Sequence, residues 1–307
     1  MIDKLQQYGL LGSIKKIPHH LQFKLNLFRK NVTQKYNYWR VRNAPVYKNP
    51  SSEEFQQIEI DLINLGIEIL DYSPNPENFI KFKSSGYFPS NYHGGMDSGV
   101  WDEKLLEHWI AFELLGLEHY QPDDIYVDVA AASSPWAKTL RDKFGIFSFA
   151  IDLDKVGKNY KDLSYYRIEN ATATTFETNS VKGASLQCAY EMFINNDDIS
   201  FIDEVARILK PGGKVIILPL YMHNHYCAYS TPEYYGKGYS DVEAKEYLRL
   251  DCLGVPSSRK YNAIKLKERI LCTIQKNKLN YRLFAIRNKS DLGNNIYCHF
   301  ILEVTKP

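Results

Sequence analysis

The sequence lacks several features that would place it in a specialised class of protein. No apolar run approaches the 18 or so residues that span a bilayer, and the first residues do not show a signal-peptide pattern. The five cysteines are odd in number and widely spaced, which argues against a disulfide framework and favours a reducing cytoplasm. There is no internal repeat and no low-complexity tract. The 307 residues therefore fit one large α/β domain with additions, or two domains at most.

Net charge is also low, but it is unevenly distributed. The formal net charge is +2, yet residues 1–42 hold nine Lys or Arg and one acid, so this arm carries +8 and the other 265 residues sum to −6. Such an arm could contact a membrane, an anionic substrate or the protein's own acidic surface, and a solvated face is the simplest interpretation. No basic stripe with interleaved aromatics continues into the body, so we expect no nucleic-acid partner.

The first third of the chain is expected to form a helical extension. Ser51 and Glu54 have the spacing of a capping box, and apolar residues then recur at helical intervals, which predicts a helix over 52–69. Asp102 is expected to cap the next helix, which Gly116 ends.

From residue 124 onward, short apolar runs alternate with helical segments. The apolar runs are 125–129, 146–151, 184–189 and 214–220, and the helical segments include 135–144 and 198–209. This alternation predicts parallel βαβ units with right-handed crossovers. Pro211-Gly212-Gly213 is expected to stop the second helix and lead into the last run.

Two further apolar runs close the chain. Tyr281–Ile286 and Ile296–Val304 are separated by a short Asn- and Gly-containing loop with no room for a crossover helix, so they must pair antiparallel. The expected fold class is α/β: a mostly parallel Rossmann-like sheet with an antiparallel C-terminal hairpin and helices on both faces, plus an N-terminal helical extension.

Three local patterns carry a resemblance to a known family. They are the strand, acid and small-residue turn of IYVDVAAASSPWAKTL (125–140), the acid-ended strand FAIDLD (149–154) and the PGG segment EVARILKPGGKVIILPLY (204–221). Over roughly 120–307 the chain resembles the bacterial, methyltransferase-11-like members of the class I S-adenosylmethionine-dependent methyltransferases. The resemblance implies seven strands, the last one antiparallel.

A fourth match is NSVKGASLQCAYEMF (179–193). Glu191 falls on the glutamate of the family's phrase, whereas Lys182 and Met192 replace its usual Asp and His. The two departures weaken any transfer of substrate chemistry from the family to this chain.

The resemblance also divides the chain. Residues 1–118 would form the basic arm and a helical extension or lid, and 119–307 the methyltransferase domain. An insertion at about 221–278 follows the PGG strand, and its length of about 60 residues exceeds ordinary loops, so we expect it to bind the acceptor.

S-adenosylmethionine is the cofactor that the resemblance implies. Asp152 ends the second strand 24 positions after Asp128 and is placed to accept both ribose hydroxyls, with Asp154 as the fallback. Asn170 occupies the place of a residue that contacts the adenine amine. The cofactor-binding residues are predicted to be Asp128, Ala130, Ala132, Ser133, Ser134, Asp152, Leu153, Asn170, Ala171 and Gln187.

The turn after the first strand has no glycine. Residues 130–134 read AAASS, and a positive φ would cost each of them about 1–2 kcal/mol, so we expect a turn without one. The absence of glycine disfavours a dinucleotide and permits S-adenosylmethionine, which brings no pyrophosphate. Ser133 and Ser134 could donate to the methionine carboxylate or cap the helix that Pro135 begins.

The segment after the PGG strand supplies the candidate catalytic residues. His223, His225 and Cys227 alternate, and a continued pleat would point all three to one side, which raises the question of a metal site. No second ligand pair accompanies them, so we predict no metal. We expect His223 or His225 to act as general base, with Glu191 as an alternative base or orienting group.

Tyrosines are abundant in the same segment and suit a sugar ring, a nucleotide sugar or a phenolic acceptor. Ser257–Tyr261 (SSRKY) is either an anion site or an exposed basic turn, and Tyr92–Gly99 (YHGGMDSG) could close as a lid. The predicted acceptor-binding residues are Tyr92, His93, Tyr221, Tyr226, Tyr229 and Arg259.

The function predicted from these residues is methyl transfer from S-adenosylmethionine to a hydroxyl of a small polar acceptor in the cytoplasm. LQCAYEMF and ILPLYMH resemble methyltransferases of surface-polysaccharide gene neighbourhoods, so a sugar of a bacterial surface glycan is one candidate acceptor. The alternatives are a non-catalytic methyltransferase-like binding protein and an NAD-dependent oxidoreductase. The sequence decides neither oxygen against nitrogen as the nucleophile nor the oligomeric state.

Overall fold

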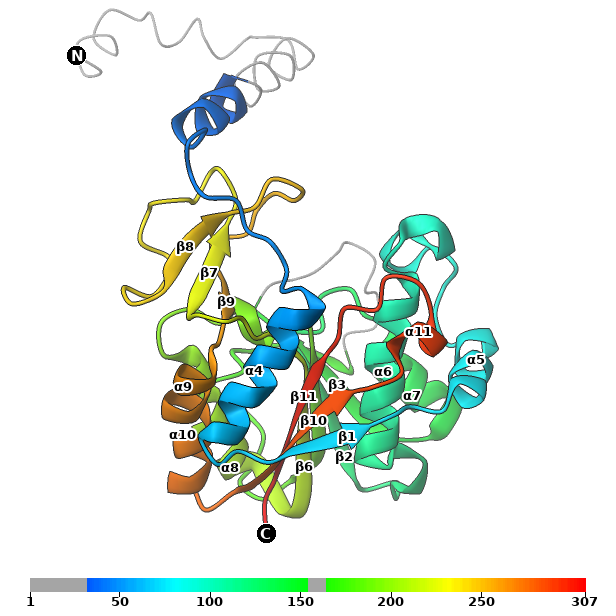
Figure 1. The fold of residues 1–307 in the computed structure, drawn as a ribbon. Helices are drawn as coiled ribbons and strands as arrows, with labels where there is room; N and C mark the ends of the chain where they lie inside the picture. Colours follow the sequence, from blue (N-terminus) through cyan, green and yellow to red (C-terminus); the bar gives the residue numbers. More distant parts are fainter. Residues whose placement is uncertain (1–31, 154–163) are drawn as a thin grey trace, which may run out of the picture.

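The protein is built around a large sheet with helices on both faces (Figure 1). The computed structural model describes residues 32–153 and 164–307. In this part of the chain the main sheet has eight strands in the order β1-β10-β11-β6-β5-β2-β3-β4. Its strands are β1 (Ile69–Tyr72), β2 (Ile125–Val129), β3 (Phe147–Asp152), β4 (Tyr166–Ile168), β5 (Val181–Gln187), β6 (Leu209–Leu220), β10 (Asn280–Ile286) and β11 (Phe300–Thr305).

The predicted fold class is confirmed. β11 runs antiparallel to both β6 and β10, and the other pairings in this sheet are parallel. Six of the seven strands from β2 to β11 correspond to the apolar runs named above, and the seventh, β4, completes the number that the resemblance implies. β1 is an addition: it comes from the N-terminal extension and pairs parallel with β10 at the edge.

Two layers of helices cover the sheet. One layer contains α4 (Ser52–Asn64), α8 (Asp197–Ile208), α9 (Ala263–Lys265), a π-helical stretch (Leu266–Leu271) and α10 (Cys272–Lys276). The other contains α5 (Pro76–Ser84), α6 (Trp101–Leu115) and α7 (Trp136–Phe144). The remaining short elements are 3₁₀ turns at Tyr92–Gly94, Met96–Ser98, Leu117–His119 and Tyr190–Met192 (η5), the helix α11 (Lys289–Leu292), and a helical stretch at 32–40.

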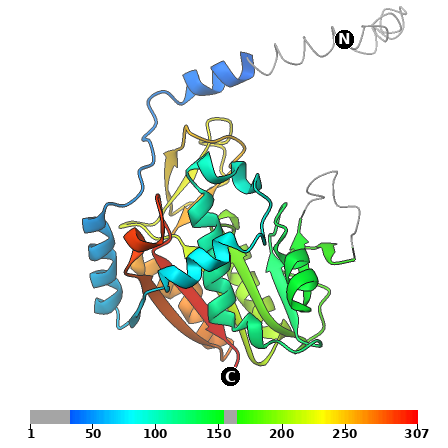
Figure 2. The same cartoon turned by 90° about the vertical axis from the view of Figure 1, so that its right-hand side faces the viewer.

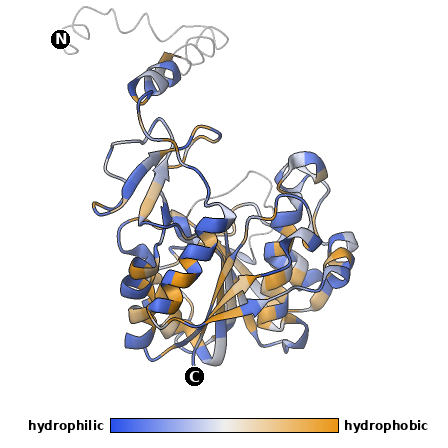
Figure 3. Ribbon diagram, in the orientation of Figure 1, coloured by the Kyte–Doolittle hydropathy of each residue, from blue (hydrophilic) through white to orange (hydrophobic). Residues whose placement is uncertain are grey.

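The middle of β6 explains why both faces are covered. Val215 and Ile217 belong to the core cluster of the first layer, whereas Ile216 and Leu218 belong to that of the second. All four side chains are fully buried, because alternate residues of a strand point to opposite faces. In Figure 3 the strands are accordingly hydrophobic, and the helices carry hydrophilic outer surfaces.

The first predicted helix has the expected start but a different end. The Glu54 amide donates to Oγ of Ser51 at 3.2 Å, and the Ser51 amide donates to Oε2 of Glu54 at 2.8 Å, so the capping box is present. The helix stops at Asn64 rather than at 69, because Gly66 adopts a φ of 75° and the chain turns into β1.

The predicted cap of the next helix was wrong. Asp102 lies inside the first turn of α6 and pairs with Lys83 at 3.0 Å, while Val100 holds the cap position. The carboxylate still lies at the positive end of the helix dipole. The predicted stop at Gly116 is confirmed by its left-handed conformation.

The PGG triplet lies within β6 rather than at the end of a helix. α8 already ends at Ile208, and β6 begins at the next residue. Gly212 has a φ of 75°, and a Cβ on Gly213 would lie 2.8 Å from the carbonyl oxygen of Lys210. The two glycines are therefore needed for a tight bend in the backbone beside β5.

A second, smaller sheet lies beyond the carboxyl ends of the parallel strands (Figures 1 and 2). It has the order β8-β7-β9 and comes from the predicted insertion. Its strands are β7 (Cys227–Ser230), β8 (Lys245–Leu248) and β9 (Ser258–Lys260). It overhangs the edge at which open α/β sheets bind their ligands.

Part of the N-terminal arm contacts this small sheet. Val46 forms a bridge with Leu248, and Arg40 donates to the carbonyl oxygens of Pro232 and Tyr235 at 2.9 and 2.8 Å. The other basic residues of the arm up to residue 31 lie outside the described residues, as does Asp154. Within the described part of the chain, no helix combines the length and apolar character of a membrane span.

Candidate functional site

A cavity lies at the carboxyl ends of β2, β3 and β5. It has a volume of about 460 Å³. Five of the ten predicted cofactor residues line it: Ala130, Asp152, Leu153, Asn170 and Ala171. The rest of the lining is mostly apolar and includes Tyr239 and Pro256 from the insertion. We refer to it as the cofactor cleft.

The turn after β2 contradicts the expectation of ordinary backbone angles. Ala130 and Ala132 have φ values of 53° and 46°, so each carries about 1–2 kcal/mol of backbone strain. The turn is held against β3: the Ala131 amide donates to the carbonyl oxygen of Ile151 at 3.0 Å, and the Ala132 amide donates to Oδ2 of Asp152 at 2.8 Å. Strained residues of this kind cluster at ligand sites.

Glycine substitutions in this turn test the strain. We expect Ala130→Gly and Ala132→Gly each to raise the free energy of unfolding by about 0.5–1 kcal/mol, because the relieved strain exceeds the entropy cost of glycine. Ala131→Gly is the matched control. Ala131 is buried and has an ordinary φ, so glycine relieves no strain there, and this variant should lose about 0.5–1 kcal/mol of unfolding free energy. Urea unfolding measures all three, and equal losses in the three variants would contradict the left-handed turn.

Asp128 ends β2 beneath this turn. It is buried, and its Oδ2 has no hydrogen-bond partner among the described residues. Burial raises the pKa of Asp128 to about 7, and the nearby charge of Asp152 raises it further, while a hydrogen bond from Ser134 lowers it. Asp128 does not line the cleft, so any effect that it has on a ligand passes through the turn that follows β2.

Three predicted cofactor residues have local hydrogen-bond partners, and a fourth, Ser133, is exposed. Ser134 accepts from the Trp136 amide at 3.2 Å and Ser133 is exposed, so the helix α7 has Pro135 and not a serine at its cap position. The side-chain oxygen of Asn170 accepts from the amide and hydroxyl of Thr172, both at 3.0 Å. The side-chain amide of Gln187 donates to Oγ of Ser185 at 2.7 Å, and Gln187 lies outside the cleft lining.

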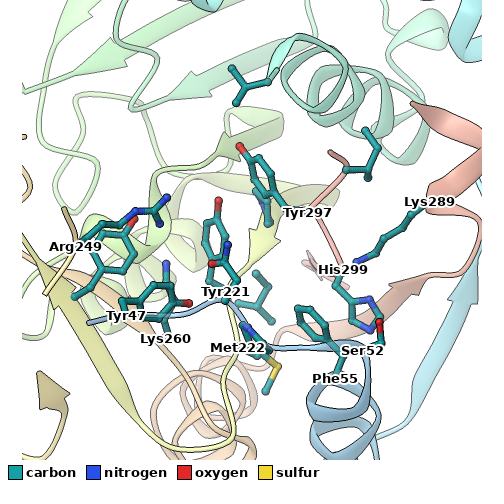
Figure 4. A pocket seen from close by; sticks show the side chains of 17 residues that line it. Tyr47, Ser52, Phe55, Tyr221, Met222, Arg249, Lys260, Lys289, Tyr297 and His299 are labelled. Carbon is teal, nitrogen blue, oxygen red and sulfur yellow. The ribbon is translucent and has the colours of Figure 1, made fainter. Parts of the chain in front are cut away.

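The second cavity is larger, about 540 Å³, and we refer to it as the basic cavity (Figure 4). Of the described residues, three cations line it, Arg249, Lys260 and Lys289, and no carboxylate does. Lys260 and Lys289 approach it from opposite sides. Its tyrosines are Tyr47, Tyr221, Tyr229 and Tyr297, of which Tyr221 and Tyr229 were predicted to contact the acceptor.

Lys260 is the most unusual of these cations. It is only 2% exposed, its Nζ donates to Oγ of Ser258 at 3.0 Å, and it lies 3.7 Å from the ring centre of Tyr221. Burial lowers the pKa of Lys260 to about 8, although the negative charge of Glu191 opposes the shift. Arg249, in contrast, is paired with Asp251 at 2.6 Å. Among the described residues Lys260 forms no ion pair, so it offers a nearly desolvated charge to a ligand.

Cys188 lies where the two cavities meet. It lines the cofactor cleft, and its Sγ lies 3.2 Å from the hydroxyl of Tyr221 and 3.6 Å from that of Tyr297. Lys104 and Glu107 of α6 also contact this sulfur, at 2.6 and 3.1 Å. Cys188 has a φ of 49°, a third left-handed residue at a strand end.

Glu191 lies on η5, between Ala189 and Met192 of the cofactor cleft, although its own side chain lines neither cavity. It is 8% exposed, and its Oε2 has no hydrogen-bond partner among the described residues. Burial raises the pKa of Glu191, while the charges of Lys260 and Lys104 lower it. A buried carboxylate oxygen with no partner, next to a ligand cavity, is suited to accept a proton.

The structure does not bring the predicted histidine bases to either cavity. His223 and His225 lie outside both linings, and the hydroxyl of Tyr247 lies 2.5 Å from Nε2 of His225. His93 is also outside both linings, and the hydroxyl of Tyr92 lies 2.9 Å from Nε2 of His108.

Two predicted acceptor residues are occupied by structural contacts. Arg259 is 3% exposed and forms ion pairs with Asp198 at 2.8 Å and with Asp241 at 2.9 Å. Tyr226 is buried and donates to Asp241. Segment 257–261 is therefore not an exposed turn, because it forms β9 inside the protein and presents Lys260 to the basic cavity.

Sequence reasoning missed Lys104, Glu107, Cys188, Lys289 and Tyr297. Lys104 and Glu107 stand three residues apart in a helix, a spacing typical of a solvent-exposed ion pair. Only the tertiary fold shows that this pair is buried against β5. The one available signal for Cys188 was its position near the end of the predicted apolar run 184–189; the observed strand β5 ends one residue before it.

The residues of the cofactor cleft fit S-adenosylmethionine. A carboxylate at the end of β3 suits the ribose hydroxyls, and the apolar side chains of Ile151, Leu153 and Phe193 suit the adenine ring. The small side chains of the turn allow a ligand to approach the backbone closely.

Comparison with known proteins identifies a methyltransferase domain within the chain. Residues 127–217 match a family model described as a methyltransferase domain, and no curated protein matches the chain. Among solved structures, the chain is similar to the geranyl diphosphate C-methyltransferase of Streptomyces coelicolor A3(2), with 14% identity over 84% of this chain and 99% of that one and a TM-score of 0.41. It is also similar to the complex of the Haloferax volcanii Trm112 activator and a putative methyltransferase, with 16% identity over 68% and 94% of the two chains and a TM-score of 0.40.

A third similar structure is a putative sarcosine dimethylglycine methyltransferase from Galdieria sulphuraria. The identity is 23%, with 37% of this chain and 45% of that chain covered and a TM-score of 0.32. The chain thus spans less than half of the length of the Galdieria protein.

The match to the family model includes the parts of the chain that build the cofactor cleft. Residues 127–217 contain the turn after β2, the acid at the end of β3 and the PGG triplet. Residues 127–217 of the chain therefore match a methyltransferase domain, and the cleft that they help to form fits S-adenosylmethionine as the cofactor.

Proposed function

We propose that the protein transfers a methyl group to a hydroxyl oxygen of a small polar acceptor that also carries an anionic group. The observation that supports this most directly is the basic cavity, which adjoins the cofactor cleft at Cys188 and contains three cations and no carboxylate in its lining. A phosphorylated sugar or a nucleotide sugar of a surface-glycan pathway combines the hydroxyl, the ring and the charge that such a lining recognises.

The cofactor would occupy the cleft at the ends of β2, β3 and β5. Asp152 would accept the ribose hydroxyls, and the turn with Ala130 would approach the amino-acid part. When bound, S-adenosylmethionine supplies an electrophilic methyl group on a sulfonium.

The basic cavity would orient the acceptor. Lys260 and Lys289, on opposite sides of the cavity, would hold its anionic group, and the rings of Tyr221 and Tyr297, stacked at 6.3 Å between centres, would flank its apolar surface. So held, the acceptor hydroxyl would point toward the junction at Cys188 and would be shielded from water.

Glu191, rather than either histidine, would take the proton at that junction. The carboxylate of Glu191 would accept the proton of the acceptor hydroxyl, while the bound sulfonium would supply the methyl group to the oxygen. The products are the methylated acceptor and S-adenosylhomocysteine. Glu191 was named from the sequence as the alternative base, and its burial beside Lys260 now makes it the better candidate.

Calorimetric titration with S-adenosylmethionine, S-adenosylhomocysteine and NAD tests the proposal. We expect micromolar binding of the first two and no heat with NAD. Asp152→Ala should weaken S-adenosylmethionine binding at least tenfold, because charge-assisted hydrogen bonds contribute about 1.5–3 kcal/mol each. The control is Asp123→Ala, an exposed acid before β2, which should bind as the wild type does.

The outcomes separate the alternatives. Heat with NAD alone would favour an oxidoreductase. No heat with any of the three ligands would leave a non-catalytic binding protein. Circular dichroism of Asp152→Ala shows whether the lost affinity reflects the ribose contact or the collapse of the turn that this residue also supports.

A further inference from the structure

A group of side chains outside both cavities has the composition of a metal site. His223 and His225 lie between β6 and β7, Cys227 begins β7, and their ligand atoms all lie within 4.8 Å of one another. Cys227 is fully buried, His223 is 8% exposed and His225 is half-buried. In the described ranges no other set of three His, Cys, Asp or Glu side chains meets in this way.

A regular strand would not bring the three together. Four residues of extended chain cover about 13 Å, which would keep the first and third side chains apart. Here the chain bends at Asn224 and His225, and the rings of His223 and His225 lie 4.3 Å apart at 70°. The convergence therefore arises from a bend immediately before β7 and not from the continued pleat that the sequence suggested.

We propose that His223, His225 and Cys227 bind one transition-metal ion, with zinc as the best match. Two imidazole nitrogens and one sulfur suit zinc, whereas magnesium and calcium require oxygen ligands. Three atoms within 4.8 Å of one another share a point at most about 2.8 Å from each, and metal bonds of about 2.0–2.3 Å need side-chain shifts of only about half an ångström. With three protein ligands, the fourth position is open to water.

The surroundings orient both histidines. The hydroxyl of Tyr247 lies 2.5 Å from Nε2 of His225, which leaves Nδ1 for the ion. Nδ1 of His223 accepts from the His225 amide at 3.4 Å, so Nδ1 carries the free lone pair and would bind the ion in place of this long contact. An outer partner such as Tyr247 fixes the ring orientation of a ligating histidine. The carboxylate of Glu54 accepts from Asn224 at 3.1 Å and places a negative charge near His223. The positive charges of Lys245 and Lys260 oppose its effect there.

The position of the site gives the ion a role in shaping the basic cavity. Tyr221 and Met222 line that cavity and directly precede His223. Tyr229 also lines it and follows Cys227 on β7, while Tyr47 packs against both His223 and Tyr229. A metal at the bend would fix this wall of the cavity. Binding of the ion requires neither the cofactor nor an acceptor, so the inference stands independently of the proposed reaction.

Metal analysis of full-length protein purified without a histidine tag tests the inference. We expect about one zinc per chain by mass spectrometry, and a loss to background in Cys227→Ser and in His225→Ala. Cys272→Ser and His119→Asn are the matched controls, because both residues are exposed and lie away from the site, and they should keep the metal. Replacement of zinc by cobalt should give a thiolate-to-cobalt absorption band that Cys227→Ser removes and Cys272→Ser keeps.

His225→Ala guards against a folding artefact, because this side chain is only half-buried. If the wild-type protein contains no metal, and added zinc binds a His225→Ala/Cys227→Ser variant as tightly as the wild type, the proposal is overturned. Binding of S-adenosylmethionine would be unaffected by that result, so the two proposals fail separately.

Discussion

Glu191→Gln is expected to lower kcat by about 10²–10⁴-fold while leaving the affinity for S-adenosylmethionine unchanged. The amide has the size of the carboxylate but cannot take the proton of the acceptor hydroxyl. The measurement is transfer of tritiated methyl groups to a panel of sugar phosphates and nucleotide sugars, with cofactor affinity followed by calorimetry. His223→Ala and His225→Ala serve as comparisons and should retain far more turnover, since the two rings contact each other and Tyr247.

The pH dependence of the reaction has a predictable sign. Burial raises the pKa of Glu191, and its base form is present only above that pKa, so kcat should rise with pH through it. In Glu191→Gln this rising limb should disappear. Full turnover in Glu191→Gln, together with loss in either histidine variant, would return the role of general base to the histidines.

The fold could be predicted because its signals are local. The capping box at Ser51, the apolar runs and the short loop between the last two strands each depend on residues close in sequence, and each is present in the structure. The edge strand β1 was missed because Ile69–Tyr72 continues an apolar helical pattern, and only pairing with β10, more than 200 residues away, makes it a strand.

The cofactor side was easier to locate than the acceptor side. Asp152 and Asn170 follow strand ends, and strand ends of a parallel sheet meet at one edge, so their position in the cleft follows from the topology. The backbone angles of Ala130 and Ala132 could not be predicted, because the local cost favours ordinary angles and the hydrogen bonds to β3 override it.

The acceptor side depends on an insertion whose fold has no simple periodic signal. Lys260 and Arg259 are neighbours in sequence and were read as one basic turn. In the structure β9 points one toward the acid pair of Asp198 and Asp241 and the other toward the basic cavity. Neighbouring residues of a strand point to opposite sides, so β9 directs Arg259 to a structural ion pair and Lys260 to the basic cavity. The sequence alone does not reveal that such a short strand exists.

Lys260→Met is expected to weaken binding of an anionic acceptor by about 10- to 100-fold, because a charge-assisted hydrogen bond contributes about 1.5–3 kcal/mol. Methionine keeps the packing against Tyr221 and removes the charge, so the protein should fold normally. Inorganic pyrophosphate serves as the probe, with affinity measured by calorimetry. The control is Lys276→Met, an exposed lysine on α10, which should bind pyrophosphate as the wild type does.

The pH dependence of pyrophosphate affinity distinguishes a direct contact with Lys260 from attraction by the overall positive charge of the cavity. Burial lowers the pKa of Lys260 to about 8, so the ammonium is present below that pH and is lost above it. Wild-type affinity for pyrophosphate should therefore fall as pH rises through about 8. Lys260→Arg should keep its affinity to higher pH, because a guanidinium does not lose its proton in this range. If the wild type and Lys260→Arg lose affinity at the same pH, or if Lys260→Met binds pyrophosphate normally, the anion is held elsewhere and the basic cavity is not the acceptor site.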